Sequence, residues 1–396
     1  MIPVLPITTS AASPMPKVTM NDPNNKIDCN VGANATYKTW YAAFEEVYGQ
    51  DNTLIGTYPY QTLTKPADNY IEYHYDSAKA ILYVTFNNVN YIRTGAADNF
   101  IRIANNNASY SNAFDIVFTF NGNNTIRGTR PTLYINNSKS VTFTGTGSLT
   151  MDGHFSSNGI ITLPSNTDFT ISNMSLTIYN SYGSGEGETG TIAGIMSYGS
   201  VIIDNATINI NAGRKSSSIR TATKVSSNLT SPTYGITIKH NSHVTLTSNS
   251  ITPLQTDGPI VFDNSTIYIS KGTGNKSPVF NRAPEIIGNY SSKKGGYGEL
   301  DRMYPGSFGL QPGDLVSTDH RLTNFELVHK HAPTDCTKES LCACTKATVP
   351  ATAESHTIEQ MEASIVTCTQ DGWEAYEFCV NCEYSTKVLT QCFLCS

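Results

Sequence analysis

The residues of this 396-residue chain that are best suited to chemistry are its cysteines, and all nine except Cys29 follow residue 335. Cys379 and Cys382 are separated by two residues, as are Cys392 and Cys395, which is a spacing typical of tetrahedral Zn²⁺ sites. An even number of cysteines in a small exported module is equally typical of disulfides. The sequence leaves both open for Cys368, Cys379, Cys382, Cys392 and Cys395, with His331 and His356 as further zinc ligands.

Carboxylates offer a second kind of chemistry. Polysaccharide hydrolases need two of them, and lyases need a calcium-binding group of acids with a basic residue. Asp152-Gly153-His154 and Asn166-Thr167-Asp168 are the nearest candidates, but Asp168 stands where a turn residue is expected. We therefore predict that the chain is not an enzyme. Asp204 and Asp263 occupy equivalent places in two repeats, where they either bind Ca²⁺ or cap their own backbone; we favour capping.

Tyrosines could instead stack against sugar rings without catalysis. Alternation along strands places Tyr134 and Tyr268 outward, and other tyrosines border the segments 183–190 and 211–233. We predict a glycan-binding set comprising Tyr134, Tyr179, Tyr182, Tyr198, Tyr234 and Tyr268. Packing of these rings along the flank of the fold is the alternative.

A recurring decapeptide must position these residues. It reads apolar, any, apolar, any, Asn, any, Ser or Thr, apolar, any, apolar at 169–178, 201–210 and 260–269, with a close relative at Val84. The period of two predicts short strands with one buried face. Asn between them suits a left-handed corner, where a β-branched residue would clash.

Coils of three such strands follow from this pattern. We predict one coil from Leu133–Ile135, Val141–Phe143 and Leu149–Met151, and the next from Ile160–Leu163, Phe169–Ile171 and Leu176–Ile178. Stacked coils make a parallel β-helix around a column of apolar side chains. A β-sandwich is the alternative, but it gives no reason for its turns to resemble one another. Irregular spacing indicates inserted loops, especially at 180–190 and 211–233.

The ends of the chain differ from this middle. Residues 36–49 show an aromatic stripe at helical spacing, which predicts an N-terminal capping helix. Residues 1–13 resemble the back half of a secretion signal, so we expect an upstream start and an exported chain, and we expect a truncated C-terminal end. The expected domains are 1–16 (signal remnant), 17–67 (cap), 68–272 (β-helix), 273–331 (closing cap and linker) and 332–396 (Cys-rich module).

Two segments carry a family resemblance: Asp115–Ile126 and Ser140–Thr150. Residues 68–272 resemble secreted clostridial carbohydrate-binding proteins with a right-handed parallel β-helix of the pectate-lyase type. The resemblance implies binding of plant cell-wall or other acidic polysaccharide, with calcium as an alternative cofactor. Cys368–Cys382 resembles the Cys-pair repeats at the ends of gut Firmicutes surface proteins, and Cys336, Cys342 and Cys344 resemble a degenerate earlier copy.

Composition narrows the function classes. Charged residues make up 15% of the chain, and the net charge of −6 leaves no basic footprint for nucleic acid. No run of about 18 apolar residues predicts a membrane span. We therefore expect an extracellular or cell-surface protein that binds polysaccharide without catalysis. An adhesin-like structural protein with cell-wall or surface-protein partners is the second hypothesis, and a degenerate polysaccharide lyase or glycosidase is the third.

Overall fold

The chain folds into an all-β structure, and no helix occurs in the part described here. The computed structural model describes residues 17–21, 26–29, 39–48, 50, 54–92, 100–104, 114–128, 133–136, 138–153, 160–163, 167–181, 192–213, 216–221, 234–248, 252–256, 258–271, 279–280, 284–295, 324–333, 335, 337–345, 347–351, 356–363, 372–380, 382, 384–387 and 389–390. Among them, no helix is long and apolar enough to cross a membrane.

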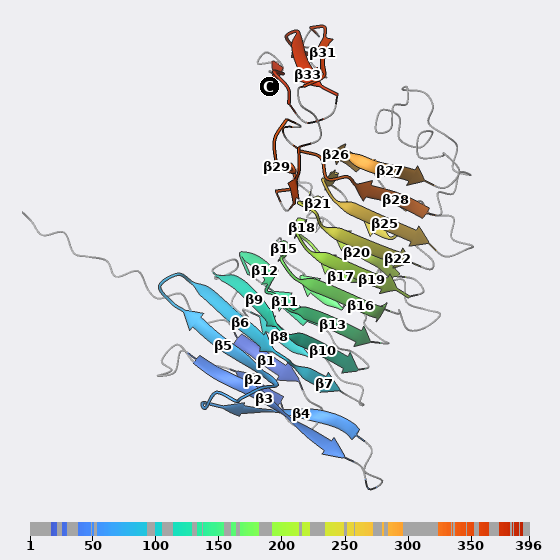
Figure 1. The fold of residues 1–396 in the computed structure, drawn as a ribbon. Helices are drawn as coiled ribbons and strands as arrows, with labels where there is room; N and C mark the ends of the chain where they lie inside the picture. The colour runs from blue at the N-terminus through green and yellow to red at the C-terminus, as the bar shows by residue number, and fades with distance from the viewer. Residues whose placement is uncertain are drawn as a thin grey trace, which may run out of the picture.

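Three long sheets make up most of the structure (Figure 1). The eight-stranded sheet has the order β2 (Lys26–Cys29), β1 (Lys17–Asn21), β8 (Ile101–Ala104), β11 (Leu133–Asn136), β14 (Ile161–Leu163), β17 (Ile192–Ser197), β20 (Ser216–Thr221) and β23 (Leu254–Gln255). The nine-stranded sheet has the order β27 (Tyr290–Gly295), β28 (Asn324–His329), β25 (Thr266–Lys271), β22 (His243–Ser248), β19 (Thr207–Ala212), β16 (Ser175–Ser181), β13 (Ser148–Gly153), β10 (Asn123–Gly128) and β7 (Asn90–Ile92).

The third sheet has eleven strands, and smaller pairs follow it. Its order is β26 (Pro284–Ile287), β24 (Ile260–Asp263), β21 (Ile236–Lys239), β18 (Val201–Asp204), β15 (Asp168–Ser172), β12 (Ser140–Thr144), β9 (Asp115–Asn121), β6 (Ile81–Asn87), β5 (Tyr70–Asp76), β3 (Thr39–Tyr48) and β4 (Leu54–Thr62). The C-terminal pairs are β29 (Ser340–Leu341) with β30 (Thr348–Val349), β31 (Ile358–Met361) with β33 (Tyr376–Cys379), and β32 (Gly372–Trp373) with β34 (Leu389–Thr390).

Through the middle of each long sheet, neighbouring strands lie three strands apart in the chain, so successive coils lie on one another. β11 pairs with β14, β12 with β15 and β13 with β16, all in parallel. These are the two coils that the sequence predicts, and their three strands are confirmed. The long parallel sheets are consistent with a β-solenoid.

Each passage from the eleven-stranded to the nine-stranded sheet turns through a left-handed residue. Along the stack, positive φ angles recur at Asn88, Gly122, Gly145, Asn173, Asn205, His240, Asn241, Asn264 and Gly288. Asn and Gly tolerate this backbone region, whereas other residues are strained in it. The repeated Asn of the decapeptide is therefore explained by the corner it occupies. In addition, the Asn205 amide donates to the side-chain oxygen of Asn173 on the preceding coil, at 2.7 Å.

The interior is the predicted apolar column. In β12, Val141 and Phe143 are fully buried while Thr142 and Thr144 face outward. Phe143 lies 4.8 Å from Phe118 and 4.9 Å from Phe169 between ring centroids, one contact on each neighbouring coil. The aromatic stack thus ties three coils together through side chains as well as backbone.

Buried hydroxyl groups stabilise the corner that leads from the eight-stranded to the eleven-stranded sheet. Thr167 donates to the carbonyl of Ser138 on the preceding coil, and Thr256 donates to the carbonyl of Tyr234. Thr221 bonds both the Tyr234 carbonyl and the Thr256 hydroxyl. Buried backbone oxygens at these turns consequently have partners away from water.

The predicted capping helix over 36–49 is wrong, because Thr39–Tyr48 form strand β3. β3 pairs antiparallel with β4 on one side and β5 on the other. Trp40, Ala42 and Phe44 alternate into the core, and Trp40 stacks on Tyr73 at 3.8 Å. The aromatic residues fit the helical period of about 3.6 as well as the strand period of two. Pairing with β4 and β5 makes the segment a strand.

The predicted loop over 211–233 is also wrong in part, because it contains β20. Ser216, Ser217 and Ser218 are fully buried there, and Ser218 donates to the Thr247 carbonyl. A buried face built from serine has no apolar signal in the sequence. At the other end, the parallel ladder continues beyond residue 272, because β26 pairs with β24.

The corner predicts a graded response to substitution at Asn205, whose φ is 50°. Asn205→Val should lower the free energy of unfolding by about 1–2 kcal/mol, since a β-branched residue is strained in left-handed backbone. Asn205→Gly should cost less, because glycine adopts this region freely. Urea unfolding followed by circular dichroism compares them with Thr207→Val on exposed strand surface. Equal stability of the two valine variants would contradict the corner's role.

Candidate functional site

The outward face of the nine-stranded sheet presents polar side chains in straight rows. Parallel pairing in register aligns equivalent residues of successive coils, about 4.8 Å apart. One row is Asn123, Ser148, Ser175, Thr207, His243 and Thr266. The next is Thr125, Thr150, Thr177, Asn209, Thr245 and Tyr268, and the third is Arg127, Asp152, Tyr179, Asn211, Thr247 and Ser270. We call these three rows the polar face.

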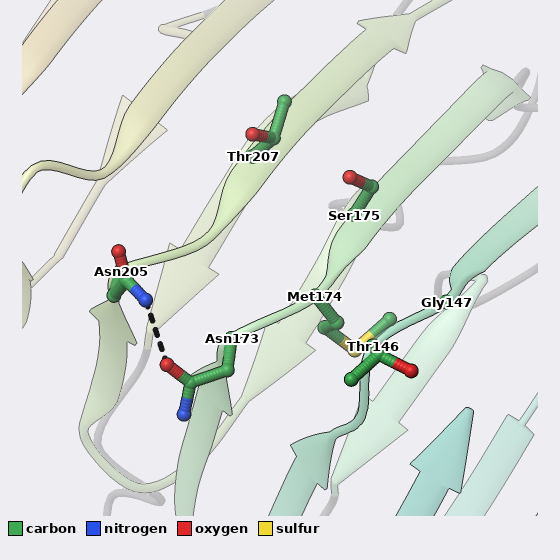
Figure 2. A pocket seen from close by; sticks show the side chains of 7 residues that line it. All are labelled: Thr146, Gly147, Asn173, Met174, Ser175, Asn205 and Thr207. Carbon is green, nitrogen blue, oxygen red and sulfur yellow. Dashed lines mark hydrogen bonds between the residues drawn. The ribbon is translucent and has the colours of Figure 1, made fainter. Parts of the chain in front are cut away.

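A shallow hollow of about 240 Å³ lies at one edge of the polar face. Figure 2 shows Asn173 and Asn205 joined by their amide hydrogen bond at the corner, with the hydroxyl groups of Ser175 and Thr207 on the following strands. The other residues that line the hollow are Thr146, Gly147 and Met174. Amides and hydroxyls from three successive coils can therefore bind hydroxyl groups of a ligand laid across the coils.

Tyr179 and Tyr268 are the aromatic residues of the polar face. Tyr179 on β16 is 41% exposed, so its ring is open to solvent. Tyr268 on β25 is half-buried and lies 5.5 Å from the His243 ring on the neighbouring strand. Both therefore point outward, as strand alternation predicts for Tyr268, and an exposed ring can stack on an apolar sugar face.

The other predicted tyrosines lie elsewhere. Tyr134 belongs to the eight-stranded sheet, where the Arg102 guanidinium lies 5.4 Å from its ring. Tyr198 and Tyr234 precede β18 and β21 at the opposite corner. Burial and the charge of Asp168 raise the pKa of Tyr234. Tyr182 lies outside the described residues. The five described tyrosines of the predicted set are divided among different surfaces.

The candidate carboxylates are separated as well. Asp204 and Asp263 lie on either side of Lys239 in the eleven-stranded sheet, two strand spacings apart. Asp204 is 2.8 Å from His240 and 3.7 Å from the Lys239 ammonium. Asp263 accepts a hydrogen bond from the Asn264 amide. These contacts give each carboxylate a protein partner, and the sheet does not unite the two as ligands of one ion.

The cysteine-rich end contains a group of side chains that could hold a metal ion. The donor atoms of His356, Cys379 and Cys382 all lie within 4.8 Å of one another. His356 Nδ1 is 3.5 Å from the Cys382 sulfur, while its Nε2 faces the Asp335 carboxylate at 3.4 Å. Hydrogen bonds from the Thr337 hydroxyl and backbone, with Lys338 beside them, lower the pKa of Asp335 to about 2. An ionised carboxylate thus orients the imidazole.

A second group unites His329, His331, Cys342 and Cys344. Of these four, His331 alone was expected as a metal ligand. His329 was not expected, because it alternates with Phe325 and Leu327 as an ordinary inward-facing strand residue. The described cysteines Cys342, Cys344, Cys379 and Cys382 form no disulfide. Cys368, Cys392 and Cys395 lie outside the described residues.

Comparisons with known proteins add no identity to this geometry. Searches against family models, curated proteins and solved structures found no match. The functional argument therefore depends on the residues alone.

The contact between Asp335 and His356 predicts that a change at Asp335 weakens metal binding although every metal ligand is kept. Asp335→Asn should weaken metal binding at the His356 cluster about 10–100-fold, the usual effect of removing a carboxylate that orients a ligating histidine. Competition with a chromophoric chelator measures this in a chain carrying Cys342→Ser and Cys344→Ser. Glu359→Gln on exposed β31 is the matched control; equal affinities for the two variants would argue against the role of Asp335.

Proposed function

We propose that this chain is an extracellular, non-catalytic carbohydrate-binding protein whose polar face binds an extended polysaccharide. Its fold would be a right-handed parallel β-helix, as in the clostridial proteins it resembles. The observation that carries the proposal is the polar face itself, with Tyr179 exposed among rows of hydroxyl and amide side chains. Cell-wall or plant polysaccharides, including acidic ones, are the ligand class.

The physical basis is preorganisation. Backbone pairing fixes the rows before a ligand arrives, so binding orders few side chains. Neighbouring hydroxyls are already coupled, as in the 3.0 Å contact between Thr247 and Ser270. A polysaccharide presents hydroxyl groups along its length and apolar ring faces between them. Rows of Ser, Thr and Asn complement the former, and Tyr179 and Tyr268 complement the latter.

The placement of acidic residues supports binding without catalysis. Asp152 faces outward from the nine-stranded sheet, whereas Asp168 begins a strand of the eleven-stranded sheet. Asp168 accepts a hydrogen bond from the Ser200 backbone at 3.2 Å, as a turn residue does. A hydrolase would need two carboxyl groups flanking one glycosidic bond. These two residues do not supply such a pair.

We further propose that the cofactor of the Cys-rich module is Zn²⁺. Thiolate and imidazole donors in one group favour zinc over calcium, which takes oxygen ligands. His356, Cys379 and Cys382 supply three such donors. Zinc would stabilise a segment whose strands are short and whose side chains are largely exposed.

Tyr179→Ala should weaken binding to the best ligand on a glycan array by about fivefold or more, because truncating an exposed aromatic anchor commonly costs over about 1 kcal/mol. Tyr134→Ala, on a different sheet, should leave the affinity unchanged. Depletion isotherms with the soluble polysaccharide compare the two variants. Loss of affinity in Tyr134→Ala but not in Tyr179→Ala would place the binding site on the eight-stranded sheet instead. Absence of glycan binding would favour the adhesin hypothesis, and release of unsaturated products would favour a lyase.

A further inference from the structure

β28, the strand of the nine-stranded sheet that comes last in the chain, places a histidine next to the cysteine-rich end. β28 lies antiparallel between β25 and β27, and it turns Phe325, Leu327 and His329 inward. The His329 backbone donates to the Thr266 hydroxyl on β25. His329 is thus fixed to the body of the stacked sheets at their C-terminal end.

The hairpin of β29 and β30 delivers two thiols to the same place. An isolated bridge pairs Pro333 with Cys342, and the Cys342 backbone donates to the Ala347 carbonyl at 2.8 Å. The Thr345 backbone donates back to Cys342, closing a tight turn. Cys342 and Cys344 are both buried in this turn. The sulfurs therefore have defined positions before any ion is considered.

The donor distances match tetrahedral zinc. The Cys342 sulfur lies 3.4 Å from His329 Nε2, and the Cys344 sulfur lies 3.3 Å from His331 Nδ1. Zn–S and Zn–N bonds of ordinary length at a tetrahedral angle separate sulfur from nitrogen by about 3.5 Å. All four donor atoms lie within 4.8 Å of one another. Two thiolates and two imidazoles form a complete structural zinc set.

A hydrogen bond orients the buried imidazole. His329 Nδ1 donates to the Asn289 carbonyl at 3.0 Å, which leaves the lone pair of Nε2 facing Cys342. Outer partners of this kind are typical of histidines that ligate metals. The Tyr290 ring covers the histidine from the neighbouring strand, with centroids 6.0 Å apart. The site is therefore enclosed on the side of the sheets.

We propose that His329, His331, Cys342 and Cys344 bind one Zn²⁺, and that this ion fastens the cysteine-rich end to the last strand of the stacked sheets. The ligands come from two segments, and among the described residues one isolated bridge, between Pro333 and Cys342, pairs these segments. A metal ion at this junction supplies the stabilisation that a small apolar core would otherwise provide. This inference is independent of glycan binding.

Metal content of the full-length chain tests the site. In a Cys379→Ser, Cys382→Ser background, we expect about one zinc ion per chain, lost on adding Cys342→Ser and Cys344→Ser. Cobalt substitution should give a tetrahedral spectrum with a thiolate charge-transfer band, again lost in that variant. Cys29→Ser, on β2, is the matched control and should keep both signals. Unchanged metal content after removal of both thiols, or a disulfide at Cys342 or Cys344 found by peptide mapping, would overturn the proposal.

Limited proteolysis tests the fastening. Chelation should make the segment beyond residue 329 more susceptible to protease and make Cys342 and Cys344 reactive towards a thiol reagent, while the β-sheet circular dichroism persists. Zinc binding without any change in proteolysis would overturn the fastening. If the cysteine variant does not fold, His331→Gln replaces it, because this ligand is exposed and its ring meets the His329 ring edge-on at the surface and is not part of the core.

Discussion

The three long sheets depend on one constraint, a left-handed residue at each corner between the eleven-stranded and nine-stranded sheets. A left-handed residue at that corner lets consecutive strands pair with those of the neighbouring coil, so the parallel ladders continue from coil to coil. The apolar column and the polar face both result from this one constraint. Successive side chains of each strand point alternately inward to the column and outward to the face.

Local pattern alone was enough to predict the coils. Val141 to Met151 and Phe169 to Ile178 contain both the strand alternation and the corner residue, so each decapeptide carries its own structural information. Prediction failed where the information was not local. Thr39–Tyr48 is a strand because of partners at residues 54–62 and 70–76. Ser216–Thr221 is buried because Ser218 donates to the Thr247 carbonyl and the Ser216 carbonyl accepts from Ser248, both on β22.

The candidate sites follow the same division. Alternation correctly predicted that Tyr134 and Tyr268 face outward, but it could not assign them to different sheets, since that depends on the count of strands per coil. The pairing of Cys379 with Cys382 could be predicted from spacing. His329 could not, because its place in a strand pattern resembles that of a core residue, and only the chain's return from residue 329 to residue 342 unites it with a thiol.

Reversed strands occur at both ends of the stack, although the end strands β7, β23 and β26 stay parallel to their neighbours. β3, β4 and β5 are antiparallel at one end of the eleven-stranded sheet, and β27 and β28 are antiparallel at one end of the nine-stranded sheet (Figure 1). A purely parallel stack would offer a terminal rung identical in polarity to the next, which is a template for end-to-end fibre growth. β28 runs against the parallel strands and β27 runs with them, while β4 is itself reversed, so at these sheet ends a second molecule would not extend an unbroken parallel ladder.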